Sequence, residues 1–392
     1  MKKIIFCFLA LTVNTSAMAM NISTHGMASK RALHQATLLK DGNVLLTGGV
    51  SSLWPIPWTL SSAEIFDPIQ NRFFSAYGMH DYHTEHAATL LPNGNVVISG
   101  GNRSAVMELF NSKTYRFEKL KAPLSARAGH TAHLIDGHKL FMIGGYFVKI
   151  NFAQNSDPQN DFIPLESDQR LLTPTFNKLG FELVPLKTCE VYDLNTQTAY
   201  EIPYPPYFSR LTMHRSLTLP NGNILIVGGM GNRENMIELD TKTETFRLFG
   251  KLKEPREDQA MLFLNDNEIL ISGGTNAKAI TTPSFEIINL QSGIASLLEI
   301  KMHEPREDHQ MLQLQDGRIV LVGGEIHGEP DQILKSVEVL DLKTNTIEIS
   351  SNLFPQGKSD HQSTLLKNGS LLMTGGEEIS GSISRAAYQA RF

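Results

Sequence analysis

The chain has 392 residues, a formal net charge of −5 and a hydrophobic fraction of 41%, as expected for a soluble globular protein with a sizeable core. The slightly acidic balance gives no electrostatic support for a nucleic-acid or anionic-membrane partner. No P-loop, dinucleotide fingerprint, HExxH, CxxC or nucleophile-elbow motif occurs, so the chemistries that depend on these motifs have no basis in the sequence.

The first 19 residues have the order of a secretory signal peptide. Lys2 and Lys3 precede an apolar run from Ile4 to Val13, and small residues follow at Ala17 and Ala19. We therefore expect cleavage after Ala19 and a periplasmic or secreted mature protein. No integral membrane segment is expected after signal removal, because no later stretch approaches the roughly 20 apolar residues of a transmembrane helix.

One pattern recurs seven times over 20–392, which predicts a single domain of repeats. Most copies lie about 45 to 52 residues apart, too far for leucine-rich or ankyrin repeats, and an insertion at 146–187 lengthens the third copy. The clearest copies are HQATLLKDGNVLLTGG from His34, HAATLLPNGNVVISGG from His86, HRSLTLPNGNILIVGG from His214 and HQMLQLQDGRIVLVGG from His309, and weaker copies begin at His130, Gln259 and His361.

Each copy predicts four antiparallel strands. An Asp-Gly or Asn-Gly pair such as Asp41-Gly42 separates two apolar runs, which is the strongest short hairpin signal and needs a positive φ. The second run is almost continuously apolar and ends in Gly-Gly, as suits a strand covered on both faces. A third strand carries a motif such as AEIFD from Ala63, and a fourth follows a short turn, as at Arg72 to Tyr77. Radial repetition of such sheets predicts an all-β, seven-bladed β-propeller.

The two ends of the domain are expected to meet in the last blade. After the seventh Gly-Gly, the sequence SRAAYQARF from Ser384 supplies only a third strand. Met27 precedes its repeat histidine by the same interval as Met79. We therefore predict that residues from about Asn21 to Met27 form the fourth strand and cover the free edge of this sheet.

The Gly-Gly strand, the downstream Glu-aliphatic-aromatic-Asp strand and the Arg-x-x-His lead-in at Arg31 and Arg127 resemble bacterial kelch repeats of the galactose-oxidase central-domain type. The resemblance extends over nearly all of the chain after the signal segment. It implies a ligand site around the central channel, on the face with the longer loops. Proteins of this type include protein-binding modules, sialic acid mutarotases and copper oxidases, so the resemblance specifies the fold more sharply than the activity.

Features present in most repeats are interpreted as structural, because a functional site must break the symmetry of the repeats. We expect the repeated histidines to bond backbone groups between blades and the repeated glutamates to pair with arginines. These residues are His34, His86, His130, His214, His309 and His361, then Glu64, Glu108, Glu190, Glu238, Glu286 and Glu338, and finally Arg31, Arg127, Arg256 and Arg306.

The features that break the symmetry lie on loops of one face, where a rigid scaffold concentrates binding residues. Trp54 and Trp58 share the first-blade loop, and Tyr204 and Tyr207 lie in the segment PYPPYF. Such rings suit the apolar faces of sugars or a peptide groove, unless they pack the loops against the propeller. The insertion at 146–187 is interpreted as a recognition loop or lid, or else as a disordered insert.

The segment HDYHTEH from His80 contains imidazole and carboxylate groups, which are ligand types for zinc or copper. Tyr82 and His83 are similar to the copper-binding Tyr-His pair of galactose oxidase. That resemblance also requires a crosslinked tyrosine–cysteine pair and a distal histidine, and neither is recognisable, since Cys189 lies in a third-strand motif. We therefore expect no metal and no cofactor, and copper oxidase activity is disfavoured.

Two functions from different classes remain. As a monomeric binding module, the protein would hold a protein or glycan ligand on the loop face. As an enzyme, it would resemble a periplasmic sialic acid mutarotase, with arginines at the channel mouth holding a substrate carboxylate and Glu or His as general acid-base. No motif supports the enzyme, which favours the binding module. The candidate ligand-binding residues are Trp54, Trp58, Tyr82, His83, Arg31, Arg127, Tyr204, Tyr207, Arg256 and Arg306.

Overall fold

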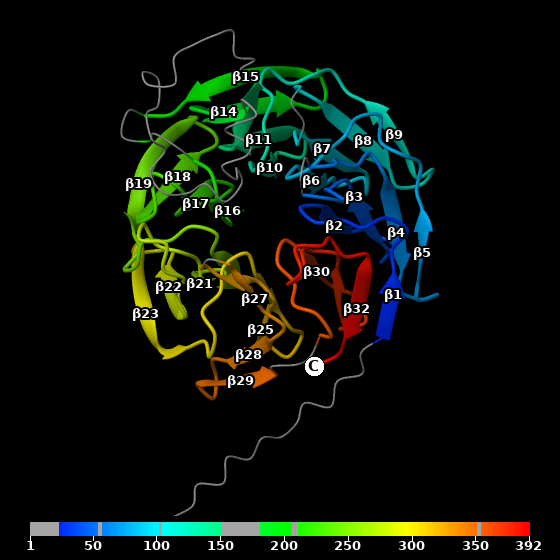
Figure 1. Cartoon of the computed structure of the whole chain (residues 1–392). Coiled ribbons are helices and arrows are strands. Elements are labelled where there is room, and N and C mark those ends of the chain that lie inside the picture. The colour runs from blue at the N-terminus through cyan, green and yellow to red at the C-terminus, as the bar shows by residue number, and fades with distance from the viewer. Residues whose placement is uncertain are drawn as a thin grey trace, which may run out of the picture.

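The computed structural model describes residues 23–53, 57–101, 104–150, 181–205, 208, 211–328, 330–350 and 354–392. All regular elements within these ranges are β-strands, and seven four-stranded antiparallel sheets surround a central axis (Figure 1). The predicted seven-bladed β-propeller is therefore confirmed. No helix in this part of the chain could span a membrane. The predicted signal peptide at 1–19 lies outside the described residues and stays a prediction.

In each blade the innermost strand comes first in the chain, and the seventh blade takes its outermost strand from the N-terminal side. From the inside outward, the first blade consists of β2 (Gln35–Leu38), β3 (Val44–Thr47), β4 (Ala63–Asp67) and β5 (Arg72–Ser75), the second of β6 (Ala87–Leu90), β7 (Val96–Ser99), β8 (Met107–Asn111) and β9 (Arg116–Lys119), and the third of β10 (Thr131–Ile135), β11 (Lys139–Ile143), β14 (Thr188–Asp193) and β15 (Thr198–Pro203). The fourth blade consists of β16 (Arg215–Thr218), β17 (Ile224–Val227), β18 (Asn235–Asp240) and β19 (Thr245–Lys251), and the fifth of β20 (Ala260–Asn265), β21 (Glu268–Ser272), β22 (Ser284–Asn289) and β23 (Ile294–Lys301). The sixth blade consists of β24 (Gln310–Gln313), β25 (Ile319–Val322), β28 (Val337–Asp341) and β29 (Thr346–Ser350), and the seventh of β30 (Gln362–Leu365), β31 (Leu371–Thr374), β32 (Ala386–Ala390) and β1 (Ser23–Gly26). Two further hairpins pair β12 (Tyr146–Ile150) with β13 (Phe181–Pro185) and β26 (Glu325–Ile326) with β27 (Gln332–Ile333).

The hydrophobic core lies between the blades. Second strands such as β3 are buried along their length because neighbouring blades cover both faces, as their continuous apolar runs predict. Fourth strands such as β5 lie at the rim and are partly exposed. The first hairpin closes through a three-residue loop rather than a two-residue turn: Leu39 bonds Asn43, and Gly42 takes a φ of 98°.

The ring of blades is continuous around the axis. The innermost strands contact one another in the order β2, β6, β10, β16, β20, β24, β30 and back to β2. In the seventh blade, β1 pairs antiparallel with β32, and the N–H of Met27 donates to the carbonyl of Arg385. The segment predicted at about Asn21–Met27 therefore lies beside the third strand of this blade from Ser23 onward, where the description of the chain begins.

A pair of glycines forms each joint between blades. In all seven joints the second glycine donates its N–H to a backbone carbonyl of the next blade, as Gly49 does to His83 at 2.7 Å and Gly376 to Arg31 at 2.9 Å. Both glycines of every pair have a positive φ, and a Cβ on the first would clash with the same carbonyl oxygen. Glycine is required because a side chain would force the blades apart.

The repeated histidines also join blades, but through hydroxyl groups instead of the predicted backbone groups. Burial lowers the pKa of these histidines well below the ordinary value, so neutral rings make the bonds. Nε2 lies 2.7–3.0 Å from the hydroxyl that precedes Gly-Gly in the neighbouring blade, in the pairs His34–Thr374, His86–Thr47, His130–Ser99 and His309–Ser272.

Three joints lack this bond. His214 instead lies 3.1 Å from Oγ1 of Thr131, and Gln259 donates to the carbonyl of Val227 at 2.8 Å. Neither ring nitrogen of His361 has a hydrogen-bond partner among the described residues. The position before Gly-Gly, which carries the hydroxyl elsewhere, is occupied in these joints by Ile143, Val227 and Val322.

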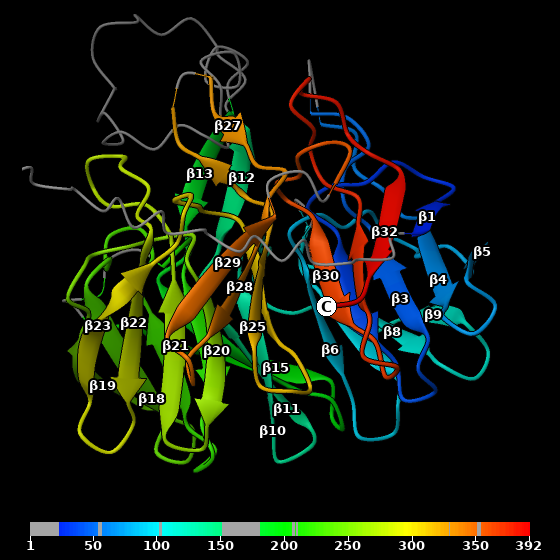
Figure 2. The same cartoon turned by 90° about the horizontal axis from the view of Figure 1, so that it is seen from below.

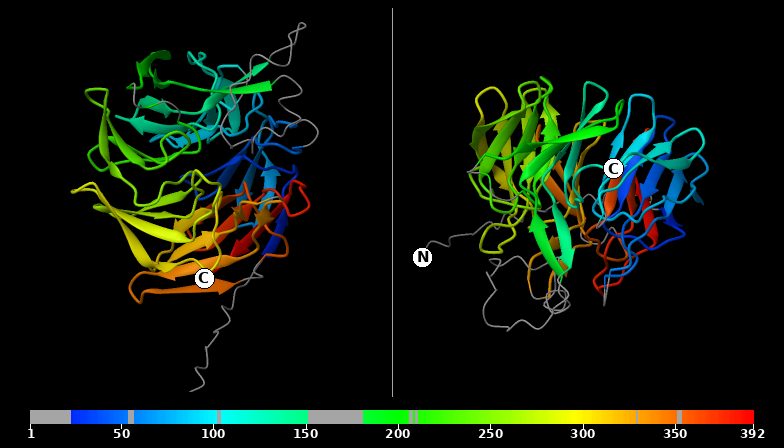
Figure 3. Two further views of the ribbon diagram at one scale, coloured as in Figure 1. Left: turned by 60° about the vertical axis from the view of Figure 1, so that its left-hand side comes forward. Right: turned by 90° about the horizontal axis from the view of Figure 1, so that it is seen from above.

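The two faces of the ring differ in the length of their loops. One face carries the tight turns within hairpins, and the other carries the longer connections, including both extra hairpins (Figure 2). We call the second the loop face. Figure 3 shows β12 and β13 projecting beyond the blades on this side. Of the insertion at 146–187, residues 151–180 lie outside the described ranges.

The hydroxyl–imidazole bond predicts opposite effects for one exchange at two equivalent positions. Thr374→Val removes the partner of a buried His34 nitrogen and should lower the free energy of unfolding by about 1–3 kcal/mol. Val322→Thr offers a hydroxyl to His361 and should raise the free energy of unfolding by about 0.5–1.5 kcal/mol. Chemical denaturation measures both, and similar losses in the two variants would show that the hydroxyl does not stabilise the ring.

Candidate functional site

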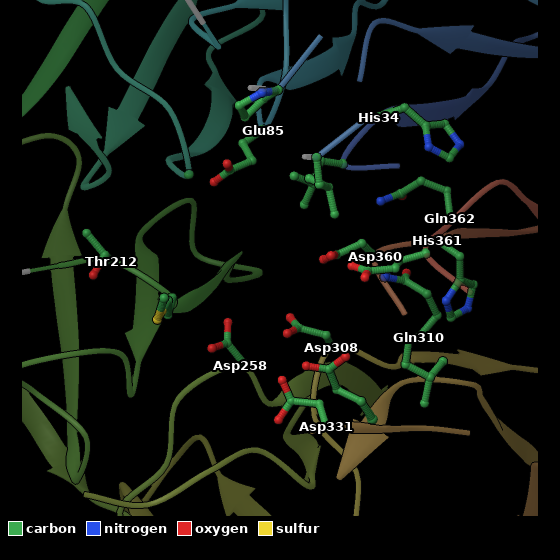
Figure 4. Close-up of a pocket in the computed structure, with 18 of the residues that line it drawn as sticks. His34, Glu85, Thr212, Asp258, Asp308, Gln310, Asp331, Asp360, His361 and Gln362 are labelled. Carbon is green, nitrogen blue, oxygen red and sulfur yellow. The ribbon is translucent and has the colours of Figure 1, made fainter. Parts of the chain in front are cut away.

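A pocket lies at the centre of the loop face and has a volume of about 910 Å³ (Figure 4). Its wall is formed by the segments that lead into the innermost strands, such as Leu33 to Gln35. Its mouth is formed by the longer connections, at Leu53, Asp331 and Ile379 among others. A volume of this size can hold a small molecule or the end of a larger ligand.

One residue of each blade lines the pocket in the left-handed backbone conformation. It is the residue directly before the repeat histidine or glutamine, and its φ lies between 50° and 63° in every blade. Backbone hydrogen bonds link ring neighbours, as from Glu85 to Leu33 at 3.0 Å and from Leu33 to Asp360 at 3.1 Å. We call these residues the axial ring, and they are Leu33, Glu85, Gly129, Met213, Asp258, Asp308 and Asp360.

Carboxylates dominate the pocket. The described lining residues include seven carboxylates. Arg215 is the single lysine or arginine among the described lining residues. Figure 4 shows Glu85 across the opening from Asp258 and Asp308. The carboxylates are Glu85, Asp258, Asp308 and Asp360 of the axial ring, Glu325 and Glu377 directly after Gly-Gly, and Asp331 between β26 and β27.

Burial and mutual repulsion raise the pKa values of several of these carboxyl groups. The pKa values of Asp258 and Asp360 lie well above the ordinary value, first because both groups are buried and second because Asp308 is close to each. The same causes raise the pKa of Glu325 to about 8. At neutral pH Asp258, Asp360 and Glu325 therefore favour the protonated form unless a cation enters the pocket.

Glu85 is held by Tyr146, and both side chains lie beside Gly129 of the axial ring. The hydroxyl of Tyr146 lies 2.8 Å from both carboxylate oxygens of Glu85 and donates to them. Burial raises the pKa of Glu85 to about 6, although the bond from Tyr146 acts in the other direction. Because Tyr146 begins β12, this contact ties the inserted hairpin to the axial ring.

The four arginine candidates do not line the pocket. Each donates to the carbonyl of the first glycine in its blade's Gly-Gly pair. The predicted pairing of these arginines with glutamates is confirmed. Their burial contradicts the predicted ligand contact, because an arginine would have to leave its ion pair to reach a ligand, and breaking a buried ion pair costs roughly 3–5 kcal/mol. The fully buried pairs, with N–O distances of 2.6–3.0 Å, are Arg31–Glu64, Arg127–Glu190, Arg256–Glu286 and Arg306–Glu338.

His83 takes the place of this arginine in the second blade. Its Nδ1 lies 2.6 Å from the carbonyl of Gly100, and its Nε2 lies 3.1 Å from the carboxylate of Glu108. Both ring nitrogens are thus occupied, and the neighbouring Tyr82 is exposed away from the pocket lining. Within the described ranges, no three His, Cys, Asp or Glu side chains are placed to hold a metal ion. The Tyr82–His83 pair therefore does not fit a copper ion.

The aromatic candidates lie in different settings. Trp58 is 70% exposed, and its neighbour Pro57 lines the pocket, so Trp58 lies beside the mouth. Tyr204 instead packs in the core between the third and fourth blades, where its hydroxyl accepts a backbone N–H. Trp54 and Tyr207 lie outside the described residues. Of the described aromatic candidates, Trp58 alone stays close to the pocket.

None of the axial-ring residues is among the candidate ligand-binding residues named from the sequence, although a comparison of the repeats points to the ring position. The histidine that follows the ring position is present in six repeats, while the ring position itself changes between Leu, Glu, Gly, Met and Asp. A variable residue beside a repeated one marks a position whose side chain does not hold blades together. Comparison of the repeats at this one position singles out four of the seven lining carboxylates as variable, although it does not show that they face a pocket.

Glu325 predicts a pH dependence of stability. Its pKa of about 8 exceeds the ordinary value of 4.5, so the folded state retains the proton between these values and loses stability as the pH rises through them. In Glu325→Gln the side chain stays neutral, so its free energy of unfolding should fall less than that of the wild type from about pH 5 to about pH 8. Denaturant unfolding at both pH values measures this, and an identical fall in both proteins would contradict the raised pKa.

No protein-family model matches the chain, and no curated protein matches it in sequence. Among the solved structures that match, a fungal alcohol oxidase of the AA5 family, in complex with copper, is similar with a TM-score of 0.71. The two chains are 16% identical, and the match covers 95% of this chain and 75% of the oxidase. At this identity the likeness concerns the fold alone, which in this chain is a β-propeller.

Proposed function

We propose that the protein is an exported, monomeric binding protein that holds a protein or glycan ligand in the central pocket of its loop face. The axial ring is the observation that carries this proposal. Its seven backbone positions are equivalent, while its side chains differ from blade to blade. Holding blades together does not require such variation, whereas recognition of an asymmetric ligand does.

The rigid setting of the ring favours recognition. Six of its seven residues adopt the left-handed conformation without being glycine, which costs about 1 kcal/mol or more for each residue. Backbone bonds between ring neighbours and the adjacent Gly-Gly joints keep this conformation in place. A ligand meets side chains whose backbone is already fixed, so little conformational entropy is lost on binding.

The acidic lining argues against the mutarotase-like alternative. That activity would need cationic groups to hold the carboxylate of the sugar, and the arginines expected to do so lie in buried ion pairs. The described lining instead offers seven carboxylates and Arg215. Since like charges repel in a partly desolvated pocket, a neutral or positively charged ligand is favoured over an acidic sugar.

Arrays of defined peptides and glycans test the proposal with fluorescently labelled protein. The pocket variant Asp258→Asn/Asp360→Asn removes two lining carboxylates, and the control Glu299→Gln/Glu348→Gln removes two exposed ones from the outermost strands β23 and β29. We expect the wild type and the control to bind the same ligands. The pocket variant should lose them, because their polar contacts lie in the pocket.

Two results would contradict the proposal. Binding that persists in the pocket variant and disappears in Trp58→Ala would place the ligand on the rim outside the pocket. Catalytic turnover of a sugar, with no array ligand retained by the wild type, would make the protein an enzyme. Thermal unfolding of all variants checks that the loss of binding is not a loss of folding.

A further inference from the structure

One carboxylate of the axial ring is buried without a partner. Asp258 is 9% exposed, lines the pocket and points into its open space (Figure 4). Within the described part of the chain its carboxylate accepts no hydrogen bond and forms no ion pair. Ionisation of a buried carboxylate in this state is unfavourable without a cationic or hydrogen-bonding partner, and the folded chain does not supply one to Asp258 within the described residues.

The carboxylates surround the pocket and do not converge on one point. Asp258, Asp308 and Asp360 come from three consecutive blades, and Glu85 lies across the opening in the second blade. No metal-holding group of three acidic, histidine or cysteine side chains exists among the described residues. A single small cation is therefore a poor match, whereas charges separated along a flexible chain can reach carboxylates of several blades.

We propose that the central pocket binds a flexible organic polycation with primary ammonium groups, of which a polyamine is the simplest form. The inference rests on the proposed function, because it assigns a ligand class to the same pocket. An ammonium group offers three N–H donors, and its charge strengthens each hydrogen bond to a carboxylate. The methylene spacers would contact Leu33, Met213 and Ile379, which also line the pocket.

The lining offers few cationic groups that could balance its carboxylates once these ionise. Arg215 partly opposes the rise in the pKa of Asp258 that burial and Asp308 cause, and His327 lies 3.1 Å from Asp331. Burial lowers the pKa of the lining histidines, which are therefore neutral near pH 7: His34, His86, His130, His214 and His361. A polycation would balance the remaining charge.

Calorimetric titration of the whole protein with spermidine tests the inference. The wild type and Glu299→Gln/Glu348→Gln should bind with equal affinity. Asp258→Asn/Asp360→Asn should bind at least about tenfold more weakly, because two charge-assisted bonds are lost. A trilysine peptide distinguishes the source of the ammonium groups, since binding tighter than that of spermidine would assign them to lysine side chains of a protein ligand.

Proton release supplies a second readout that needs no variant. A bound ammonium group favours the ionised form of nearby carboxyl groups, so binding near pH 7 should release protons. The measured heat should then change with the ionisation enthalpy of the buffer. Spermidine binding without proton release, or binding weakened equally in the pocket and control variants, would refute the inference.

The two proposals fail in different ways. If neither spermidine nor trilysine binds, while the pocket variant still loses its array ligands, the polycation is wrong and the binding pocket stands. If the pocket variant retains every ligand, both proposals are wrong.

Discussion

The Gly-Gly joint is the constraint on which the rest of the propeller depends. Seven N–H groups bond seven carbonyls across the gaps between blades, and side chains are excluded from these contacts by steric clash. Because the bond joins backbone to backbone, the spacing of the blades does not depend on residues that vary between repeats. The accepting carbonyl lies three residues before the repeat histidine, so the joint also positions the segment that leads to the axis.

The repeated arginines and glutamates form further hydrogen bonds at this joint. Where a blade lacks the arginine, another nearby residue takes part in the polar contact instead. Arginine binds both a Gly-Gly carbonyl and the glutamate of the third strand, which in turn accepts backbone N–H groups of the incoming segment. In the fourth blade Leu211 replaces arginine, and Glu238 bonds an arginine of the fourth strand instead. In the seventh, Lys358 pairs with Glu378 from the loop. The polar groups that hold the blades together therefore bond one another, and the side chains of the axial ring are not needed for these contacts.

Most of the fold could be predicted from the sequence because its determinants are local and repeated. Gly-Gly, the glycine turns and the apolar runs each act within a few residues. The site could be predicted only in its place on the loop face. A sequence does not show burial, so Arg31 suits a surface anion site and a core ion pair equally well, and Tyr204 suits a sugar platform and a core contact equally well. The axial ring depends on a left-handed φ, which Glu85 and Asp258 give no sign of adopting.

The pairing of β1 with β32 has a kinetic consequence. Each of the other six blades is built from a single stretch of the chain, and contacts between residues close in sequence form quickly. The seventh joins Ser23–Gly26 to Ala386–Ala390, so its loop-closure entropy is the largest in the molecule. The bond from Leu33 to Asp360 likewise connects the first blade with the last. We therefore expect the ring to close late in folding, and the axial ring to become continuous only at that step.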